Sequence, residues 1–288
     1  MLRKLFKYDF KSLSRMMWTI NIGVIILSIF ISAVFTINLR CSGTALAGAG
    51  TLINILRIVS LLFVALACTA IGVAAIAVTI LLAYRFYKNF FDNEGYLTFT
   101  LPVSTNAKLI SKILSAFVWT LISFVAMLIA CAIILLFGTA TTGIINTGII
   151  SELKELFAFI IPRIGLNEIF LIIELILICL ASVIFNIILI FLSITIGSII
   201  ANKHKILASV GMFFVINMLV NILQTVSIFA TTSIMAGKIE ILGSNITFSE
   251  SASAVHFLLI SQTFIMIAFC IISYVIMHRM LEKKLNLP

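Results

Sequence analysis

Charged residues are scarce in this chain of 288 residues: they make up 10% of it, while apolar residues make up 62%. A soluble domain is usually nearer one quarter charged and one half apolar. The scarcity of charge excludes an ordinary soluble globular domain, because a single core cannot bury so much apolar surface. Long apolar runs recur instead, and each matches the roughly 30 Å of bilayer hydrocarbon that a spanning helix must cross.

Several other patterns are missing. Strands that alternate apolar and polar residues do not occur, which excludes a membrane barrel and leaves helices as the spanning structure. The five cysteines never form a CxxC pair, so they are typical of small core residues rather than of a zinc site or a disulfide framework. The sequence therefore predicts an all-α, polytopic bundle of transmembrane helices.

Motifs for bond chemistry are also lacking. No G-x-x-x-x-G-K-[ST] sequence is present, so we expect this chain to bind no nucleotide through a P-loop. Neither H-E-x-x-H nor G-x-S-x-G occurs, and the histidines His204, His256 and His278 lie far apart in the sequence. We therefore expect no enzymatic activity, no catalytic residue, no metal site and no cofactor on this polypeptide.

Six apolar runs are long enough to span a bilayer. They are residues 17–38, 59–84, 113–137, 168–200, 206–231 and 255–278. Residues 17–278 then form a single transmembrane domain, with a loop at 85–112 and a tail at 279–288. A signal peptide is the alternative for the first run, but that run exceeds the usual length of such a core and no A-x-A site closes it.

The basic residues predict the orientation of these spans. Of the 19 Lys and Arg residues, 14 lie on the side that holds both termini and the second and fourth loops, and 5 lie on the other side. Because positive charge resists translocation, the side with 14 is expected to be cytoplasmic. We therefore expect a multi-pass protein of the cell (plasma) membrane with both termini in the cytoplasm. We expect its net charge of +9 to orient the spans in the membrane and to contact anionic lipid of the bilayer, and not to bind nucleic acid.

Residues 1–16 have the pattern of an amphipathic helix. Apolar residues fall on one side of a helical wheel and Lys4, Lys7, Lys11 and Arg15 on the other. Such a helix lies in the membrane interface, with its apolar face among acyl chains. It either anchors the first span or also contacts a cytoplasmic partner.

The cytoplasmic loop is unusually rich in aromatic residues. It reads YRFYKNFFDNEGYLTFTLPVSTNAKLISK from Tyr84 to Lys112. Six aromatic side chains within 86–99 cannot all face water without forming an apolar patch of the kind that marks an interaction site. Gly95 indicates a turn, while Pro102 and Ser104 indicate a stop followed by the N-cap of the next helix. This pattern predicts a short aromatic helix, a turn and a return helix.

Here the sequence resembles the permease subunits of type 2 ATP-binding-cassette (ABC) transporters, particularly the small six-span bacterial ones. RFYKNFFDNEGYLTFTLPVS and the following KLISKILSAF carry the resemblance. The family relationship implies a coupling helix in this loop that docks on a separate cassette ATPase subunit, which binds the ATP. The implied docking residues are Phe91, Asp92, Glu94, Gly95, Tyr96 and Leu97, with Pro102 ending the segment. It also implies a second permease subunit, in a homodimer or a heterodimer, and a direction that leans toward export. The alternative for the aromatic residues is an interfacial belt lying on lipid.

A few polar residues lie inside the predicted spans. Glu174 is about two turns into the fourth span, and an intramembrane carboxylate is by default a functional candidate. Asn217, Asn221 and Gln224 recur at helical spacing on one face of the fifth span. All four residues are candidates for a translocation path, although a structural role is favoured for Glu174 and helix packing for the amides.

Three questions stay open at this point. The segment 149–163 has helical spacing and is expected on the outer surface, and 230–254 has the composition of a loop with a possible re-entrant piece. The substrate is not legible from the sequence. An ion-gradient-driven secondary transporter or channel, or a non-transporting membrane anchor or sensor, is the alternative function.

Overall fold

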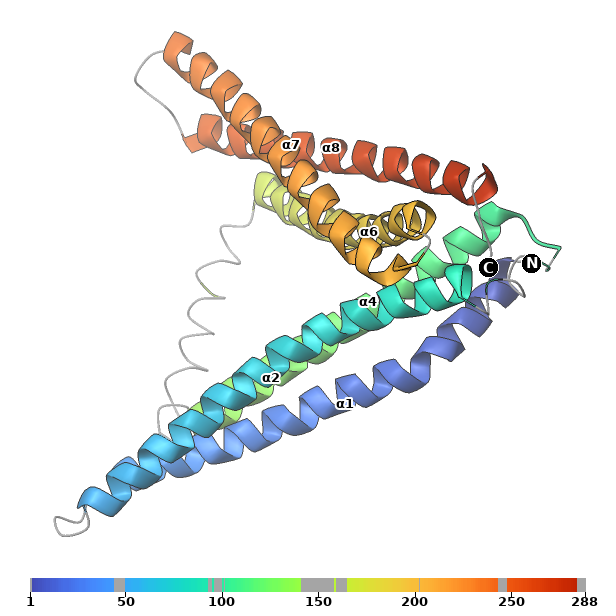
Figure 1. Ribbon diagram of the computed structural model, residues 1–288. Coiled ribbons are helices and arrows are strands. Elements are labelled where there is room, and N and C mark those ends of the chain that lie inside the picture. Colours follow the sequence, from blue (N-terminus) through green and yellow to red (C-terminus); the bar gives the residue numbers. More distant parts are fainter. Residues whose placement is uncertain are drawn as a thin grey trace. The chain divides into compact units, whose positions relative to one another are not determined.

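A computed structural model of the protein describes residues 2–43, 50–92, 95, 100, 102–140, 158, 165–201, 203–242 and 248–283. The regular elements in these ranges are all α-helices, as Figure 1 shows. They are α1 (Leu2–Gly43), α2 (Gly50–Phe91), α4 (Thr105–Ala140), α6 (Leu166–Ile200), α7 (Lys205–Leu242) and α8 (Phe248–Lys283). The predicted all-α fold class is confirmed.

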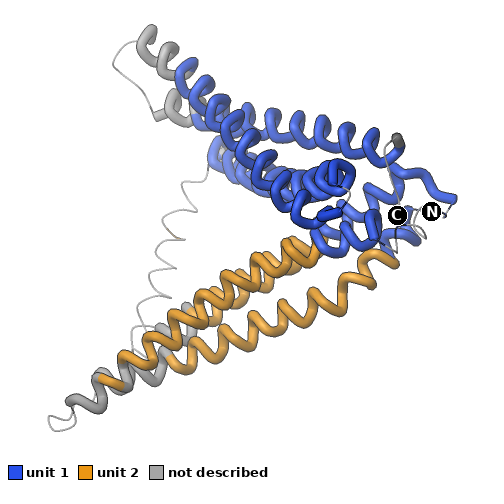
Figure 2. The backbone as a smooth tube through the Cα atoms, viewed as in Figure 1, with its two compact units in different colours: residues 1–7, 83–117, 164–288 blue, residues 8–82, 118–163 orange. Residues whose placement is uncertain are grey.

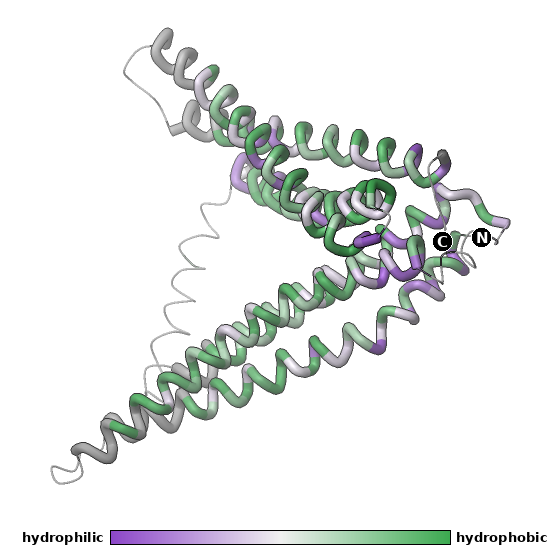
Figure 3. Tube along the Cα trace, viewed as in Figure 1, coloured by the Kyte–Doolittle hydropathy of each residue, from purple (hydrophilic) through white to green (hydrophobic). Residues whose placement is uncertain are grey.

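Six helices are long and apolar enough to cross a membrane, and they correspond to the six predicted spans. Figure 3 shows the apolar stretches along each of them. Even α6, with 35 residues, is roughly 50 Å long, which exceeds the hydrocarbon thickness of about 30 Å. The chain is therefore a multi-pass helical membrane protein whose helices extend beyond the hydrocarbon.

Two helix boundaries near the N-terminal segment and the coupling loop differ from the predicted ones. The N-terminal segment and the first span form one continuous helix, α1, and the aromatic residues after Tyr84 continue α2 as far as Phe91 instead of forming a separate short helix. No proline or glycine interrupts either junction. The predicted coupling loop at 85–112 therefore includes the last turns of α2 and the first turns of α4.

The interpretation of 230–254 as a loop is wrong for most of its length, because α7 continues to Leu242 and α8 begins at Phe248. Ser and Thr are compatible with a helix, since their hydroxyls can donate to carbonyls one turn back. Thr231 donates to the Ser227 carbonyl at 2.9 Å, and Ser233 donates to the Phe229 carbonyl at 2.8 Å. The segment 149–163 lies outside the described residues except for Ala158.

The chain divides into two compact units, coloured separately in Figure 2. Unit 1 comprises residues 1–7, 83–117 and 164–288, and unit 2 comprises residues 8–82 and 118–163. Unit 1 thus contains α6, α7 and α8 together with the end of α2, the loop and the beginning of α4.

In unit 2, Trp119 of α4 is fully buried and binds the N-terminal part of α1. Its indole N–H donates to the Phe10 carbonyl at 3.2 Å, its ring stacks on Phe10 with centroids 4.8 Å apart, and Trp18 meets it edge-on. Leu13 and Met17, which belong to the apolar face of the predicted interfacial helix, are also buried. Part of that face therefore packs on protein.

In unit 1, α6 packs along both α7 and α8, which contact each other much less. Phe185 and Leu189 of α6 form a core cluster with Val220 of α7, and Met266 and Phe269 of α8 pack against it. In a bilayer, such helices associate through close packing and polar contacts, because lipid tails are as apolar as the helices themselves. α6 is therefore the central helix of unit 1.

The backbones of α6 and α7 come very close together at Gly197. A Cβ atom built on Gly197 would collide with the backbone of Ser209, whose N atom would lie only 2.5 Å away. Ser209 also donates a hydrogen bond to the Lys205 carbonyl at 2.8 Å, and its hydroxyl lies 3.4 Å from that of Ser198. Small residues thus allow the two backbones to meet beside the short turn that joins them.

We therefore expect Gly197→Ala to destabilise the α6–α7 hairpin by about 1–3 kcal/mol, the usual cost of overpacking. Gly211→Ala is the matched control, because nothing lies within 4 Å of a Cβ atom built there. The control should be neutral or slightly stabilising, since alanine favours the helix over glycine by about 1 kcal/mol. Unfolding of the purified variants in detergent measures both effects, and equal stability of the two variants would contradict the packing argument.

Candidate functional site

The aromatic residues at the end of α2 are mostly buried. Phe86, Phe90 and Phe91 are 1%, 0% and 6% exposed, so their rings belong to the core of unit 1. Phe86 and Phe90 contact each other with centroids 4.8 Å apart, and Tyr87 stacks on Phe91 at 6.2 Å. The aromatic residues that predict an interaction surface therefore also pack in the core of unit 1, where they hold the end of α2.

The ring of Phe86 lies flat against that of Phe191 on α6. The centroids are 4.0 Å apart and the planes differ by 7°. Phe191 is itself 2% exposed. An aromatic pair of this kind contributes about 0.5–1.5 kcal/mol beyond the burial of its area. The stack therefore joins the helix that leads into the loop directly to the central helix of unit 1.

The loop between α2 and α4 begins with a turn and ends with a helix cap. The N–H of Gly95 donates to the Asp92 carbonyl at 2.7 Å, and Gly95 is buried. The N–H of Ala107 donates to the Ser104 hydroxyl at 3.4 Å, and α4 begins at Thr105, so the predicted N-cap is confirmed.

The structure places the predicted docking residues as follows. Phe91 and Gly95 are buried, Asp92 is half-buried and Pro102 is exposed. Glu94, Tyr96 and Leu97 lie outside the described residues. Two of the four described docking residues, Phe91 and Gly95, are thus buried in unit 1. The docking role of the segment stays a prediction.

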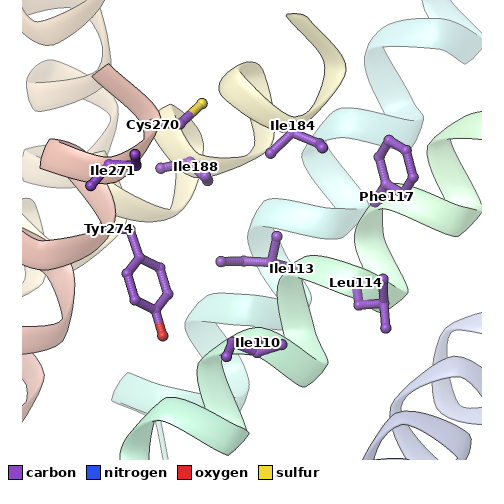
Figure 4. A pocket seen from close by; sticks show the side chains of 9 residues that line it. All are labelled: Ile110, Ile113, Leu114, Phe117, Ile184, Ile188, Cys270, Ile271 and Tyr274. Carbon is purple, nitrogen blue, oxygen red and sulfur yellow. The ribbon is translucent and has the colours of Figure 1, made fainter. Parts of the chain in front are cut away.

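The beginning of α4 also contacts α8. The Tyr274 hydroxyl donates to the Asn106 side-chain oxygen at 3.0 Å, and the Tyr274 ring stacks on His278. Beside this contact, residues of α4, α6 and α8 line an open apolar cavity of about 410 Å³. Figure 4 shows its lining: Ile110, Ile113, Leu114, Phe117, Ile184, Ile188, Cys270, Ile271 and Tyr274. Apart from the tyrosine hydroxyl and the cysteine thiol, this cavity offers a ligand only apolar contacts.

Glu174 of α6 has a partner that the sequence analysis did not identify. Its carboxylate lies 2.8 Å from Nδ1 of His256 on α8, and the two side chains are 17% and 20% exposed. One signal in the sequence was available, since both residues lie near the beginnings of predicted spans that start on the same side of the membrane. No sequence rule, however, indicates that α6 and α8 are neighbours.

No contact that the structure describes joins the three predicted amides of α7 to another helix. The Asn221 amide N–H donates to the Asn217 side-chain oxygen at 2.6 Å, within the same helix, and Asn221 is exposed on unit 1. Gln224 is half-buried. The polar contact between α7 and α8 is made by Ser227 and Gln262, at 3.4 Å. Sequence reasoning missed this pair, because single Ser and Gln residues give no periodic pattern.

Compared with family models, curated proteins and solved structures, the chain matches none of them. The resemblance to ABC permeases therefore depends on residues 85–104 and 108–117 alone, at the end of α2, in the loop and at the beginning of α4.

The Phe86–Phe191 stack gives a testable expectation. Phe86→Ala should lower the stability of unit 1 by about 3 kcal/mol or more, because it removes a fully buried ring and leaves a cavity. The matched control is Phe214→Ala on α7, whose ring is 67% exposed. Thermal unfolding of both variants in the same detergent measures the difference. An equal loss of stability in the two variants would show that the Phe86–Phe191 stack does not stabilise unit 1.

Proposed function

We propose that this protein is the membrane-spanning permease subunit of an ABC transporter, in which ATP hydrolysis on a separate ATPase subunit moves a substrate across the cell membrane. The observation that carries the proposal is the Phe86–Phe191 stack at 4.0 Å. A transport subunit without its own P-loop needs a rigid element that receives force at the cytoplasmic surface and passes it to the helices. The end of α2, held flat against α6, has the properties of such an element.

The composition of unit 1 supports the same proposal. The loop between α2 and α4 belongs to one compact unit with α6, α7 and α8. The loop is also braced from the other side, since α4 begins with the buried residues Lys108 and Leu109 and binds α8 through Asn106 and Tyr274. A displacement of the loop is therefore resisted by two helices at once, and it moves α6 and α8 with it.

The proposed assembly has two permease subunits and two ATPase subunits. The ATPase docks on the loop through Asp92, Glu94, Tyr96 and Leu97, while Phe91 supports them from within. Aromatic anchors supply most of the affinity in such interfaces, and acidic residues select the register against basic residues of the partner. The expected direction of transport is export, and both termini lie in the cytoplasm together with the loop.

Docking is tested by the variants Tyr96→Ala and Glu94→Ala in the full chain, expressed with a cassette ATPase that co-purifies with the wild type. Each should weaken co-purification of the ATPase by about tenfold or more, as expected for anchors at an interface. Tyr84→Ala is the matched control, because Tyr84 is an aromatic residue of α2 that lies before the loop and is 50% exposed. Unchanged ATPase binding by both test variants, in correctly inserted protein, would refute the docking role of the loop.

Orientation is tested independently of the ATPase. A single cysteine at Ser104, in a chain whose five native cysteines are replaced, should react with a membrane-impermeant maleimide only when the cytoplasmic face is accessible. Ser104 is exposed and follows the exposed Pro102, so the reagent can reach it. Labelling from the outside of intact cells would invert the topology and remove the basis of the proposal.

One observation favours a second candidate, a secondary transporter driven by an ion gradient. Glu174 and His256 are in contact at 2.8 Å between apolar helices, and ionisable groups in spans are common on ion pathways. Substrate movement in ATP-free vesicles under a proton gradient would support this candidate against the ABC permease. A chain that binds a partner but moves nothing would instead be a membrane anchor or sensor.

A further inference from the structure

Unit 1 has another cavity, beside the turn that joins α6 to α7. It is open and has a volume of about 540 Å³. Tyr87, near the end of α2, lines it together with residues 203–207 and 210 of the turn and of α7. All of these residues belong to unit 1. Whereas the cavity of Figure 4 is apolar, this one combines basic side chains, a phenol hydroxyl and apolar side chains.

Three consecutive residues supply the basic side of the cavity: Lys203, His204 and Lys205. In the part of the chain that the structure describes, neither lysine forms an ion pair with a carboxylate. The nearest acidic residues of α6 and α7 are Glu174 and Glu240, each more than 25 positions from the turn. On these two helices the positive charge of the turn therefore has no acidic residue near it, and such a group of charges attracts anions.

The backbone of the turn is held in place on both sides of the lysines. The N–H of Ala201 donates to the Gly197 carbonyl at 3.1 Å. The hydroxyl of Ser209, a buried residue, donates to the Lys205 carbonyl at 2.8 Å. Because the backbone that carries the basic side chains is already fixed, a ligand that binds them loses less free energy to ordering of the chain.

The end of α2 supplies a further polar group, the Tyr87 hydroxyl. The Tyr87 ring stacks on Phe91 with centroids 6.2 Å apart, and the preceding residue, Phe86, stacks on Phe191 of α6. The tyrosine is thus held beside the helix that leads into the turn. Asp92 follows directly after α2 but does not line the cavity. A phenol hydroxyl can donate a hydrogen bond to a phosphate oxygen.

An apolar strip continues from the cavity along α7. It consists of Leu207, Val210, Phe214 and Met218, which recur at helical spacing and are between 49% and 73% exposed on unit 1. From Leu207 to Met218 the strip is roughly 16 Å long, which is about half of the roughly 30 Å of bilayer hydrocarbon. A small soluble anion would use only the basic side of the cavity, whereas a lipid would use the basic side and the strip together.

We propose that the cavity between Tyr87 and the α6–α7 turn binds the phosphate-bearing headgroup of one anionic phospholipid, whose acyl chains lie along the apolar strip. The lysines and the phenol hydroxyl bind the phosphate, as basic pockets between membrane helices bind anionic headgroups. A zwitterionic phospholipid binds less tightly, because its own ammonium group meets the positive charge of the turn. The site requires neither an ATPase nor a transported substrate, so it is independent of the proposed function.

Native mass spectrometry tests the proposal on the full chain, purified in detergent and titrated with phosphatidylglycerol or phosphatidylcholine. The wild type should bind one phosphatidylglycerol about tenfold more tightly than phosphatidylcholine, since each basic residue near an anionic headgroup contributes about fivefold. The double variant Lys203→Gln, Lys205→Gln should lose this preference. The matched control Lys4→Gln, Lys7→Gln removes the same charge from exposed residues of α1 that do not line the cavity, and it should keep the preference.

Soluble anions form the second arm of the test. Inorganic phosphate and glycerol phosphate carry the same charged group without acyl chains, so neither should displace the bound lipid more than chloride of equal ionic strength does. Displacement by either compound would show a site for small anions and would overturn the proposal.

A third measurement uses the wild type alone and remains decisive if the lysine variant fails to fold. Phosphatidylglycerol with a photoactivatable diazirine in an acyl chain should cross-link within residues 206–218 of α7. Cross-links confined to other helices would overturn the proposal. So would an equal affinity of the wild type for the two lipids, or the same loss of preference in the lysine variant and in its α1 control.

Discussion

The constraint on which unit 1 depends is that helices in lipid must be held together by specific contacts. Apolar surface alone gives no preference for a neighbouring helix over lipid tails. α6 meets this constraint at three places along its length: Gly197 lets α7 approach closely, Phe191 accepts the ring of Phe86, and Glu174 binds His256. Each contact belongs to a different partner helix, so α7, the end of α2 and α8 are all fixed relative to one helix.

These three contacts differ in how they respond to a change. The close approach at Gly197 depends on shape alone, so it is either present or lost. The aromatic stack depends on area and geometry, and it tolerates small sliding movements. The Glu174–His256 contact depends on the direction of a single hydrogen bond between two polar side chains. Among the three, the contact between α6 and α8 is therefore the one that a small change of side-chain geometry breaks most readily.

The sequence predicts the six helices well because hydrophobic length is a local property that each segment carries by itself. It places their ends less well, since the ends depend on capping, and the hydroxyls of residues such as Thr231 and Ser233 satisfy carbonyls inside a helix where composition favours a loop. The N-cap at Ser104 was predictable, because Pro102 and Ser104 form a short-range pattern. The Phe86–Phe191 stack was not, since 24 phenylalanines give no indication of which two rings meet.

The positions of Phe191 and Glu174 on one helix relate the loop to the contact between Glu174 and His256. They are 17 residues apart, so an uninterrupted α6 separates them by roughly 25 Å. No glycine or proline lies between them, and such a segment transmits a displacement rather than absorbing it by bending. A movement of the end of α2 that shifts Phe191 must therefore also shift Glu174 relative to His256, unless α8 follows through its contact with α4. The Tyr274 hydroxyl donates to Asn106, so α8 is held at the start of α4 as α6 is held at the end of α2 by the Phe86–Phe191 stack. The two ends of the loop therefore contact the same two helices that Glu174 and His256 join.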